Sequence, residues 1–207
     1  MYSLMFISIT LLALYLVFLL WYGGKGKPLT AVEIADFMRQ LQAQIQAQGE
    51  HPQDTLDEIQ SLLSRDDGQE FVMQNLVRYR PKALYPPGYD LGDDPRAADQ
   101  RYAKAILWPL LKNGNVLVFV GRCNGTFIEP EGADAWHYVA MVRYRSRRDF
   151  ARFALESAKA NIFVHKWAAI EKTHVFPVKP IISLMMVRGT VAALILLIGA
   201  FLVSITR

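Results

Sequence analysis

The chain has 207 residues and a formal net charge of +4, and 52% of its residues are hydrophobic while 20% are charged. The charge is small and spread along the sequence, so composition gives no argument for nucleic-acid binding and we expect no nucleic-acid partner. Cys123 is the single cysteine, which excludes an intrachain disulfide.

An uncharged apolar segment covers residues 4–22. A helix of this length rises about 1.5 Å per residue and crosses the bilayer hydrocarbon core, which is about 30 Å thick. A cleavable signal peptide would have a basic start, a shorter apolar core and a small-residue cleavage site, and the segment has none of these. We predict a retained transmembrane helix with a basic flank over residues 1–28.

A second apolar segment covers Val187–Ile205, and its one charge, Arg188, stands at the entrance, where a long side chain can reach the headgroups. We predict a second transmembrane helix within residues 181–207. Small residues along it would permit close packing on another helix, such as the first segment. These residues are Gly189, Ala192, Ala193, Gly199 and Ala200.

Lysine and arginine accumulate on the cytoplasmic side of membrane proteins. The flanks that face the central region carry most of the basic residues, including Lys25, Lys27, Lys179 and Arg188, whereas the outer flanks carry only Arg207. We therefore predict a two-pass protein of the bacterial inner membrane with a cytoplasmic central region. The expected partners are the lipid bilayer and, as a further option, another membrane protein.

Residues 29–69 are predicted to form a helical connector between the first anchor and the main domain. Thr30 and Glu33 have capping-box spacing at the start of a helix that is expected to end at Gly49. A second helix is expected over residues 54–65. Packing against neighbours is favoured over a role in docking a partner.

The phrase Val-Arg-Tyr-Arg occurs twice, at residues 77–80 and 142–145, and each copy ends a strand-like run that precedes a helix-like run. Strands are predicted at Phe71–Tyr79, 116–121, 136–144 and 173–178. Helices are predicted at 94–113, with a kink or break at Pro109, and from Phe150 onward. This β-α-β-β-α-β order predicts an α+β, ferredoxin-like domain over residues 70–180, with both helices on one face of an antiparallel sheet.

Several strings resemble a small uncharacterised bacterial family, a domain of unknown function within the dimeric α+β barrel superfamily. They are 74–79, Ala83, 85–86, 101–103, 113–114, 118–121, 136–144, 146–147 and Phe150. The resemblance covers roughly residues 70–178, and the two anchors and the helical connector depart from it. It implies the fold and a sheet-to-sheet homodimer, and it implies no catalytic residue because the chemistry of the family is not established.

Enzymes of the wider superfamily use a pocket between the sheet and the helices. By this resemblance a pocket here would be lined by Asn75, Tyr102, Trp108, Phe119, Trp136, His137 and Phe153. The same aromatic spacing is typical of a plain core, which we favour. The amide of Asn75 would orient a ligand carbonyl or, as we favour, bond to the backbone at a strand edge.

Other reactive residues give weaker signals. His137, His165 and His174 would each serve as a haem ligand or general base, but their spacing matches no metal motif, so we favour structural roles and expect no metal or cofactor. We expect Cys123 to be an inert thiol. A run of arginines would either contact anionic headgroups or, as favoured here, form a salt-bridged face. It consists of Arg143, Arg145, Arg147, Arg148 and Arg152.

The sequence thus favours a membrane-anchored, ferredoxin-like interaction or small-ligand-binding module without catalysis. The alternative is an enzyme, either a cofactor-independent oxygenase or a haem-handling protein, that acts on an apolar substrate.

Overall fold

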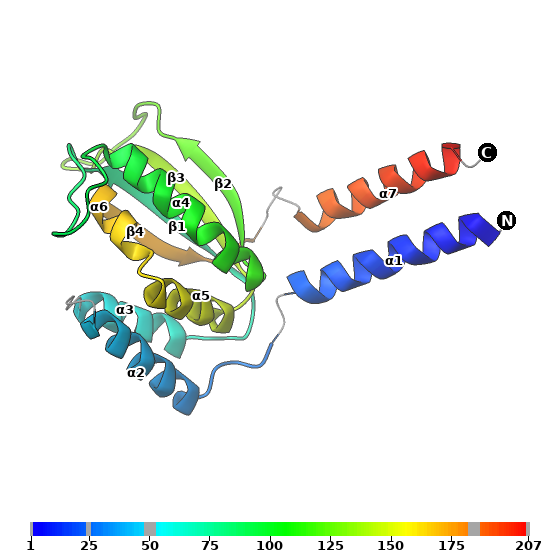
Figure 1. The fold of residues 1–207 in the computed structure, drawn as a ribbon, viewed down its shortest axis with the longest axis horizontal. Coiled ribbons are helices and arrows are strands. Elements are labelled where there is room, and N and C mark those ends of the chain that lie inside the picture. The colour runs from blue at the N-terminus through cyan, green and yellow to red at the C-terminus, as the bar shows by residue number, and fades with distance from the viewer. Residues whose placement is uncertain (1, 24–25, 48–52, 182–186, 206–207) are drawn as a thin grey trace. The chain divides into compact units, whose positions relative to one another are not determined.

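The computed structural model describes residues 2–23, 26–47, 53–181 and 187–205 (Figure 1). The chain divides into two compact units. Met1–Gly23 together with Pro180–Arg207 forms the first, which we call the helix pair. Gly24–Lys179 forms the second, which we call the globular unit.

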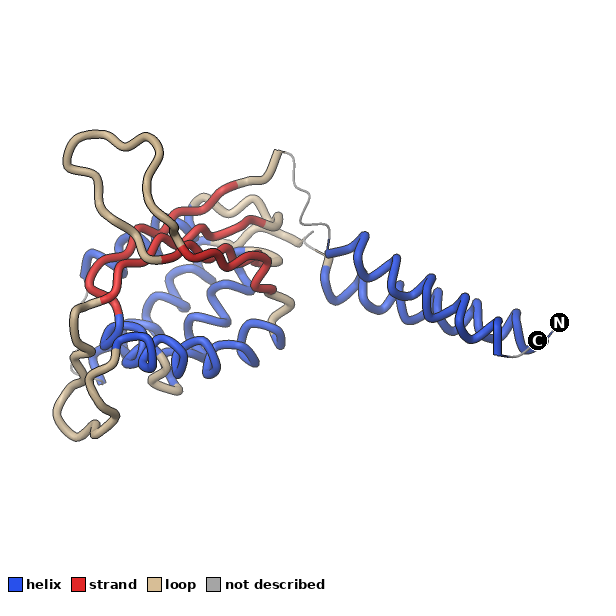
Figure 2. The backbone as a smooth tube through the Cα atoms, turned by 90° about the horizontal axis from the view of Figure 1, so that it is seen from above, coloured by secondary structure: helices blue, strands red, loops and turns tan. Residues whose placement is uncertain are grey.

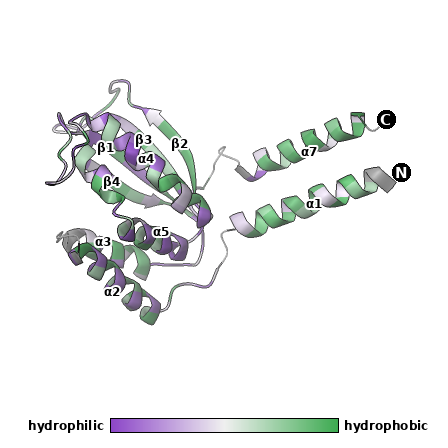
Figure 3. Ribbon diagram, viewed as in Figure 1, coloured by the Kyte–Doolittle hydropathy of each residue, from purple (hydrophilic) through white to green (hydrophobic). Residues whose placement is uncertain are grey.

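The helix pair consists of α1 (Tyr2–Tyr22) and α7 (Val187–Ile205), and both helices are mostly apolar along their length (Figure 3). Both are long and apolar enough to cross a membrane, judged by length and composition. They pack on each other at Gly199, where an added Cβ would lie 2.9 Å from the Leu11 Cδ1 atom. One of the small residues singled out in the sequence therefore does permit close approach to the first helix.

The globular unit contains a four-stranded sheet with strand order β2-β3-β1-β4, in which all neighbours are antiparallel. The strands are β1 (Phe71–Tyr79), β2 (Val116–Arg122), β3 (Tyr138–Tyr144) and β4 (Ile170–Val178). Helix α4 (Pro95–Lys112) connects β1 to β2, while α5 (Arg147–Lys159) and α6 (Phe163–Ala169) connect β3 to β4. These helices lie on one side of the sheet (Figure 2). The predicted α+β class and antiparallel sheet are confirmed.

Three details differ from the sequence-based expectation. Strand β3 begins at Tyr138, so Trp136 and His137 precede it. Helix α6 was not predicted, because seven residues are too few to display helical periodicity, and β4 begins at Ile170, directly after it. Helix α4 continues through Pro109 to Lys112 without a break. Burial of Leu110, which is 2% exposed, holds this last turn against the core.

Helices α2 (Ala31–Ala47) and α3 (Gln53–Ser64) precede the sheet, and the expected helix end at Gly49 lies outside the described residues. The capping box is present, because the Thr30 amide donates to Glu33 Oε2 at 2.8 Å and the Glu33 amide donates to Thr30 Oγ1 at 3.3 Å. Arg148 of α5 donates to the same carboxylate, and these bonds lower the pKa of Glu33 to about 2. The two helices are therefore tied to α5 within the globular unit.

The main hydrophobic core lies between the sheet and the helices. It consists of Leu62, Phe71, Met73, Leu110, Val142, Tyr144 and Phe153. A second cluster lies toward the other end of the sheet and is built around Val77, Ala98 and Ile170. Because Phe71, Met73 and Val77 face this core, strand alternation directs Val72, Gln74 and Leu76 to the opposite face.

Candidate functional site

The face of the sheet that the helices leave uncovered has an apolar centre. The register places Val139 and Met141 of β3, and Phe176 of β4, beside the outward-facing residues of β1. We call this surface the outer sheet face. Its apolar centre consists of Leu76, Phe119, Val139, Met141 and Phe176, and the polar side chain of Gln74 lies between Met141 and Phe176. None of these five side chains is fully buried, and Phe119 is 42% exposed.

Phe119 lies on the outer sheet face together with Gly121. A Cβ atom at position 121 would lie 2.7 Å from the Phe119 Cζ atom, so glycine leaves the space that the aromatic ring occupies. The pairing of β2 with β3 shifts register between Leu117 and Phe119. This irregularity changes the side of the sheet to which the following residues point.

Charged side chains border one end of the outer sheet face. Arg78 donates to Glu171 Oε2 at 3.0 Å and to Asp134 Oδ1 at 3.3 Å. Lys172 Nζ lies 2.6 Å from Asp134 Oδ2. The outer sheet face therefore combines an apolar centre with a border that contains charges of both signs.

On the helix side of the sheet, a carboxylate is held between two strands and a helix. The Tyr79 hydroxyl donates to Asp99 Oδ2 at 2.8 Å, and the Tyr138 hydroxyl donates to Asp99 Oδ1 at 3.1 Å. Burial raises the pKa of Asp99 despite these two donors. Burial and the adjacent carboxylate raise the pKa of both tyrosines. We call Tyr79, Asp99, Tyr138 and Lys166 the Asp99 cluster.

Lys166 of α6 completes the Asp99 cluster. Its ammonium nitrogen lies 4.8 Å from the centroid of the Trp167 ring, and burial lowers its pKa to about 8, although Asp99 opposes this shift. Ionisable groups with displaced pKa values gather at functional sites more often than elsewhere, although structural networks displace them too. Asp99 was not predicted as a site residue, because its partners Tyr79 and Tyr138 lie 20 and 39 residues away in the sequence.

The Asp99 cluster predicts an unusual alkaline stability profile. Lys166 binds a proton in the unfolded chain up to its ordinary pKa of 10.5 but loses it near pH 8 in the folded protein. The free energy of unfolding should therefore rise between about pH 8 and pH 10. Above about pH 10 it should fall, because the raised pKa values of Tyr79 and Tyr138 keep both hydroxyls protonated in the folded protein when they ionise in the unfolded chain. Lys166→Met should abolish the rise in urea unfolding curves, and Lys172→Met, at an exposed position, should preserve it.

His165 and its surroundings extend this polar region. The Tyr85 hydroxyl lies 3.0 Å from His165 Nδ1, and the Tyr85 ring stacks on the Tyr89 ring with centroids 5.6 Å apart. The pKa of His165 is lowered, chiefly by burial and also by the charge of Arg101. The Arg101 Nη1 atom is buried and has no hydrogen-bond partner among the described residues.

The structure does not bring all the residues of the expected pocket together. Tyr102 and Phe153 lie on the helix side of the sheet. Phe153 is 4% exposed, and the Tyr102 and Phe163 ring centroids are 6.4 Å apart. Phe119 lies on the opposite face, and Trp108, 71% exposed, points away from the core. The turn of α4 that holds Trp108 directs Leu110 inward instead.

The polar residues of the expected pocket have partners within the protein. The Asn75 amide donates to the carbonyl oxygens of Met73 at 3.1 Å and Ala140 at 3.3 Å. The Tyr79 backbone amide donates to His137 Nδ1 at 3.1 Å, and His137 is exposed. Trp136 is half-buried ahead of β3. Both side chains are thus engaged within the protein, and the structural roles favoured for Asn75 and His137 stay predictions.

The five arginines between residues 143 and 152 all form ion pairs. Arg143 contacts Glu70, Arg145 and Arg152 contact Asp149, Arg147 contacts Asp66 and Asp67, and Arg148 contacts Glu33. This pattern is the salt-bridged face favoured by the sequence.

The basic residues that flank the apolar segments differ in their surroundings. Lys27 is exposed, Lys179 pairs with Asp67 at 3.2 Å, and the Arg188 guanidinium lies 4.9 Å from the Tyr22 ring centroid. Lys25 lies outside the described residues.

Metal-ligating residues do not converge in the described part of the chain. No group of three or more His, Cys, Asp or Glu side chains there is arranged to hold a metal ion. Cys123 is exposed, and His174 stacks near Phe176 with ring centroids 5.0 Å apart. The expected absence of a metal or cofactor stays a prediction.

Comparison with known proteins gives a structural likeness. No family model matches the sequence, and no curated protein matches it. The crystal structure of RPA0582, a protein of unknown function from Rhodopseudomonas palustris, is similar with a TM-score of 0.55 and 22% identity, covering 65% of this chain and 97% of that chain. A crystal structure of methylated RPA0582 is similar with a TM-score of 0.55 and 22% identity, covering 64% of this chain and 94% of that chain. The central part of the chain therefore shares an α+β fold with a protein of unknown function.

Proposed function

We propose that this chain is a membrane-anchored, ferredoxin-like module of the bacterial inner membrane that forms a homodimer through its outer sheet face and serves as an interaction or small-ligand-binding domain without catalysis. The observation that carries this proposal is the uncovered apolar centre of the outer sheet face. The strand order β2-β3-β1-β4 supports the ferredoxin-like assignment, because the split β-α-β arrangement interleaves its strands in this way. It also supports the resemblance to the dimeric α+β barrel superfamily.

The chemistry of the outer sheet face favours a second copy of the chain as its partner. Specific interfaces combine a central apolar region with a polar border. The border here contains Arg78 and Lys172 together with Asp134 and Glu171, so it carries both signs of charge. A twofold arrangement brings the same surface together with itself, and mixed charges permit this without net repulsion.

The helix pair supports the membrane assignment. Large apolar side chains such as Phe6, Leu20 and Leu196 are 71%, 81% and 73% exposed, which an aqueous environment would not favour over such a length. The excess of lysine and arginine on the inner flanks supports a cytoplasmic globular unit.

The competing proposal, an oxygenase or haem-handling enzyme that acts on an apolar substrate, draws on the Asp99 cluster. The displaced pKa values of Asp99 and Lys166 are the kind of perturbation found at catalytic sites. Against this proposal, the side chains of Asn75 and His137 are already engaged by the protein backbone. We therefore favour binding or interaction over catalysis.

Native mass spectrometry of the full chain in mild detergent tests the proposal. We expect a dimer, and a monomer at all concentrations would contradict it. A small molecule that copurifies with the dimer would identify the ligand class, and turnover of that molecule would favour the enzyme instead.

A substitution at the centre of the outer sheet face should weaken the dimer. Met141→Lys places a charge between Phe119 and Gln74, in the interface that two copies would share. We therefore expect the dissociation constant to rise at least about tenfold, equivalent to about 1.4 kcal/mol. Sedimentation equilibrium in detergent measures this change. Trp108→Phe, on the helix side of the sheet, is the control and should leave the dimer unchanged.

A further inference from the structure

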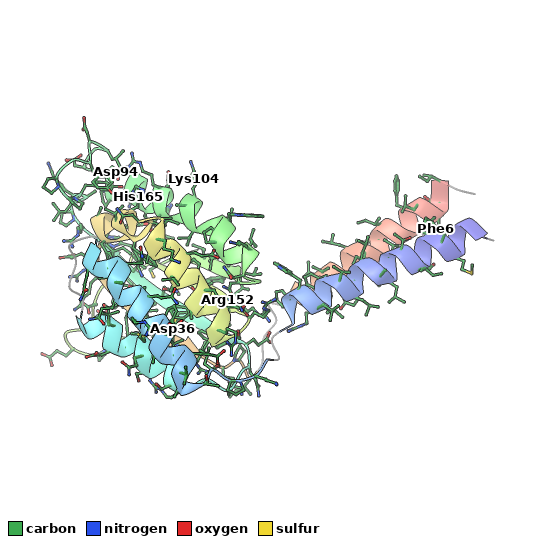
Figure 4. All side chains as sticks on the ribbon, turned by 60° about the horizontal axis from the view of Figure 1, so that its bottom comes forward. Phe6, Asp36, Asp94, Lys104, Arg152 and His165 are labelled. Carbon is green, nitrogen blue, oxygen red and sulfur yellow. The ribbon has the colours of Figure 1, made fainter. Side chains whose placement is uncertain are left out.

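The C-terminal half of α4 presents a second apolar surface in addition to the one that packs on the core. Leu110 is 2% exposed and faces the core, whereas Leu107 and Trp108 are 51% and 71% exposed. Lys104, four residues before Trp108, is exposed (Figure 4). Leu111, four residues after Leu107, is half-buried. Residues three and four positions apart are neighbours on a helix, so these four side chains form one continuous stripe.

This stripe lies at a particular end of the globular unit. Helix α4 ends at Lys112 and β2 begins at Val116, which pairs with Arg143, while Arg143 and Val178 both pair with Val72. The C-terminal end of α4 and the last residue of β4 are therefore at the same end of the sheet (Figure 1).

Both connections to the apolar helices start from that end. The chain leaves β4 at Val178, and the Gly26 amide donates to the Gly68 carbonyl at 2.9 Å, just before β1 begins. Gly26 is only four residues beyond Tyr22, and four extended residues span at most about 14 Å. A short tether therefore begins at the end of the globular unit that carries the α4 stripe.

The composition of the stripe matches the headgroup region of a bilayer. Tryptophan prefers the membrane interface, and burial of a leucine side chain there is favourable because it removes apolar surface from water. A lysine can extend its apolar stem along such a surface while its ammonium group contacts anionic headgroups. Tethering also raises the local concentration of the lipid surface, so a weak contact becomes populated.

We propose that Lys104, Leu107, Trp108 and Leu111 form a lipid-contact surface that places the C-terminal half of α4 in the headgroup region of a membrane containing anionic lipid. This inference rests on the membrane anchoring proposed above. It assigns a role to Trp108, which neither the core nor the outer sheet face uses.

Tryptophan fluorescence quenched by brominated acyl chains tests the inference in the full chain. Three variants each keep one tryptophan, at Trp21, Trp108 or Trp167, and carry phenylalanine at the other three positions. They are reconstituted in nanodiscs of phosphatidylcholine and phosphatidylglycerol with bromine near the headgroup end of the chains. Trp167 is the matched control, because it is 39% exposed and its carbonyl accepts from Arg80, at the other end of β1.

We expect strong quenching of Trp21 and Trp108 and little quenching of Trp167. Quenching of Trp21 without Trp108 would overturn the lipid-contact surface while leaving the anchoring intact. Loss of quenching at Trp21 would overturn the anchoring itself, and the inference with it. Equal quenching at Trp108 and Trp167 would show unspecific adsorption and would also overturn the inference.

A second measurement covers the case in which a single-tryptophan variant fails to fold. In a Cys123→Ser background, Trp108→Cys and Lys159→Cys change exposed positions and accept a spin label. The label at position 108 should be more accessible to oxygen than to a water-soluble nickel complex, and the label at position 159, the last residue of α5, should show the reverse. Equal behaviour of the two labels would contradict the proposal.

Discussion

Replacement of Phe153 by alanine is expected to lower the free energy of unfolding by about 3–5 kcal/mol, because it leaves a cavity in the main core. Phe153 is 4% exposed, and its ring centroid lies 5.9 Å from that of Tyr144, within the cluster that also includes Phe71 and Met73. Urea unfolding followed by near-ultraviolet circular dichroism measures the change.

Phe119→Ala is the matched control, because the same aromatic-to-alanine change is made where the ring is 42% exposed. We expect a loss well below that of Phe153→Ala under conditions in which the protein is monomeric. Similar losses for the two variants would contradict the assignment of Phe153 to the core and of Phe119 to the outer sheet face.

Replacement of Arg143 by methionine should cost about 2–4 kcal/mol. The Arg143 side chain is 5% exposed, and its guanidinium donates to Glu70 Oε2 at 3.0 Å and to the Gly114 carbonyl at 3.1 Å. Methionine fills much of the volume but removes the donor to the Gly114 carbonyl and the ion pair with Glu70. Differential scanning calorimetry should therefore show a clearly lower Tm.

Arg152→Met provides the comparison within the same run of arginines. The Arg152 side chain is 58% exposed and shares Asp149 with Arg145, so its removal should change stability by less than about 1 kcal/mol. If Arg152→Met lowered the Tm as much as Arg143→Met does, the greater stabilisation expected from the buried arginine would be contradicted.

The regular elements of this fold could be predicted because their patterns are local. Strand β1 has the bounds predicted from its apolar-rich run, the capping box of Thr30 and Glu33 is formed, and α7 matches the second apolar segment. These features depend on residues a few positions apart, so a single sequence displays them.

The candidate sites were harder to predict because they depend on contacts between distant residues. The Asp99 cluster joins β1, α4, β3 and α6, and nothing near Asp99 in sequence marks it as a tyrosine-bound carboxylate. Phe119 was expected in a pocket with Phe153. The register shift between Leu117 and Phe119 instead places the Phe119 side chain on the outer sheet face. An irregularity of this kind has no periodic signal.

The interleaved strand order has a consequence for how the protein is made. The neighbours of β1 are β3 and β4, both from the second half of the domain, and Asn75 pairs with Ala140 and Val175. The first half therefore contains no two strands that pair with each other, although the Val-Arg-Tyr-Arg phrase appears in both halves. During synthesis, the 58 residues 80–137 follow β1 before β3, its first partner in the sheet, begins, and such a separation slows folding. A nascent chain that stops before β3 would expose an unpaired apolar strand to chaperones and proteases.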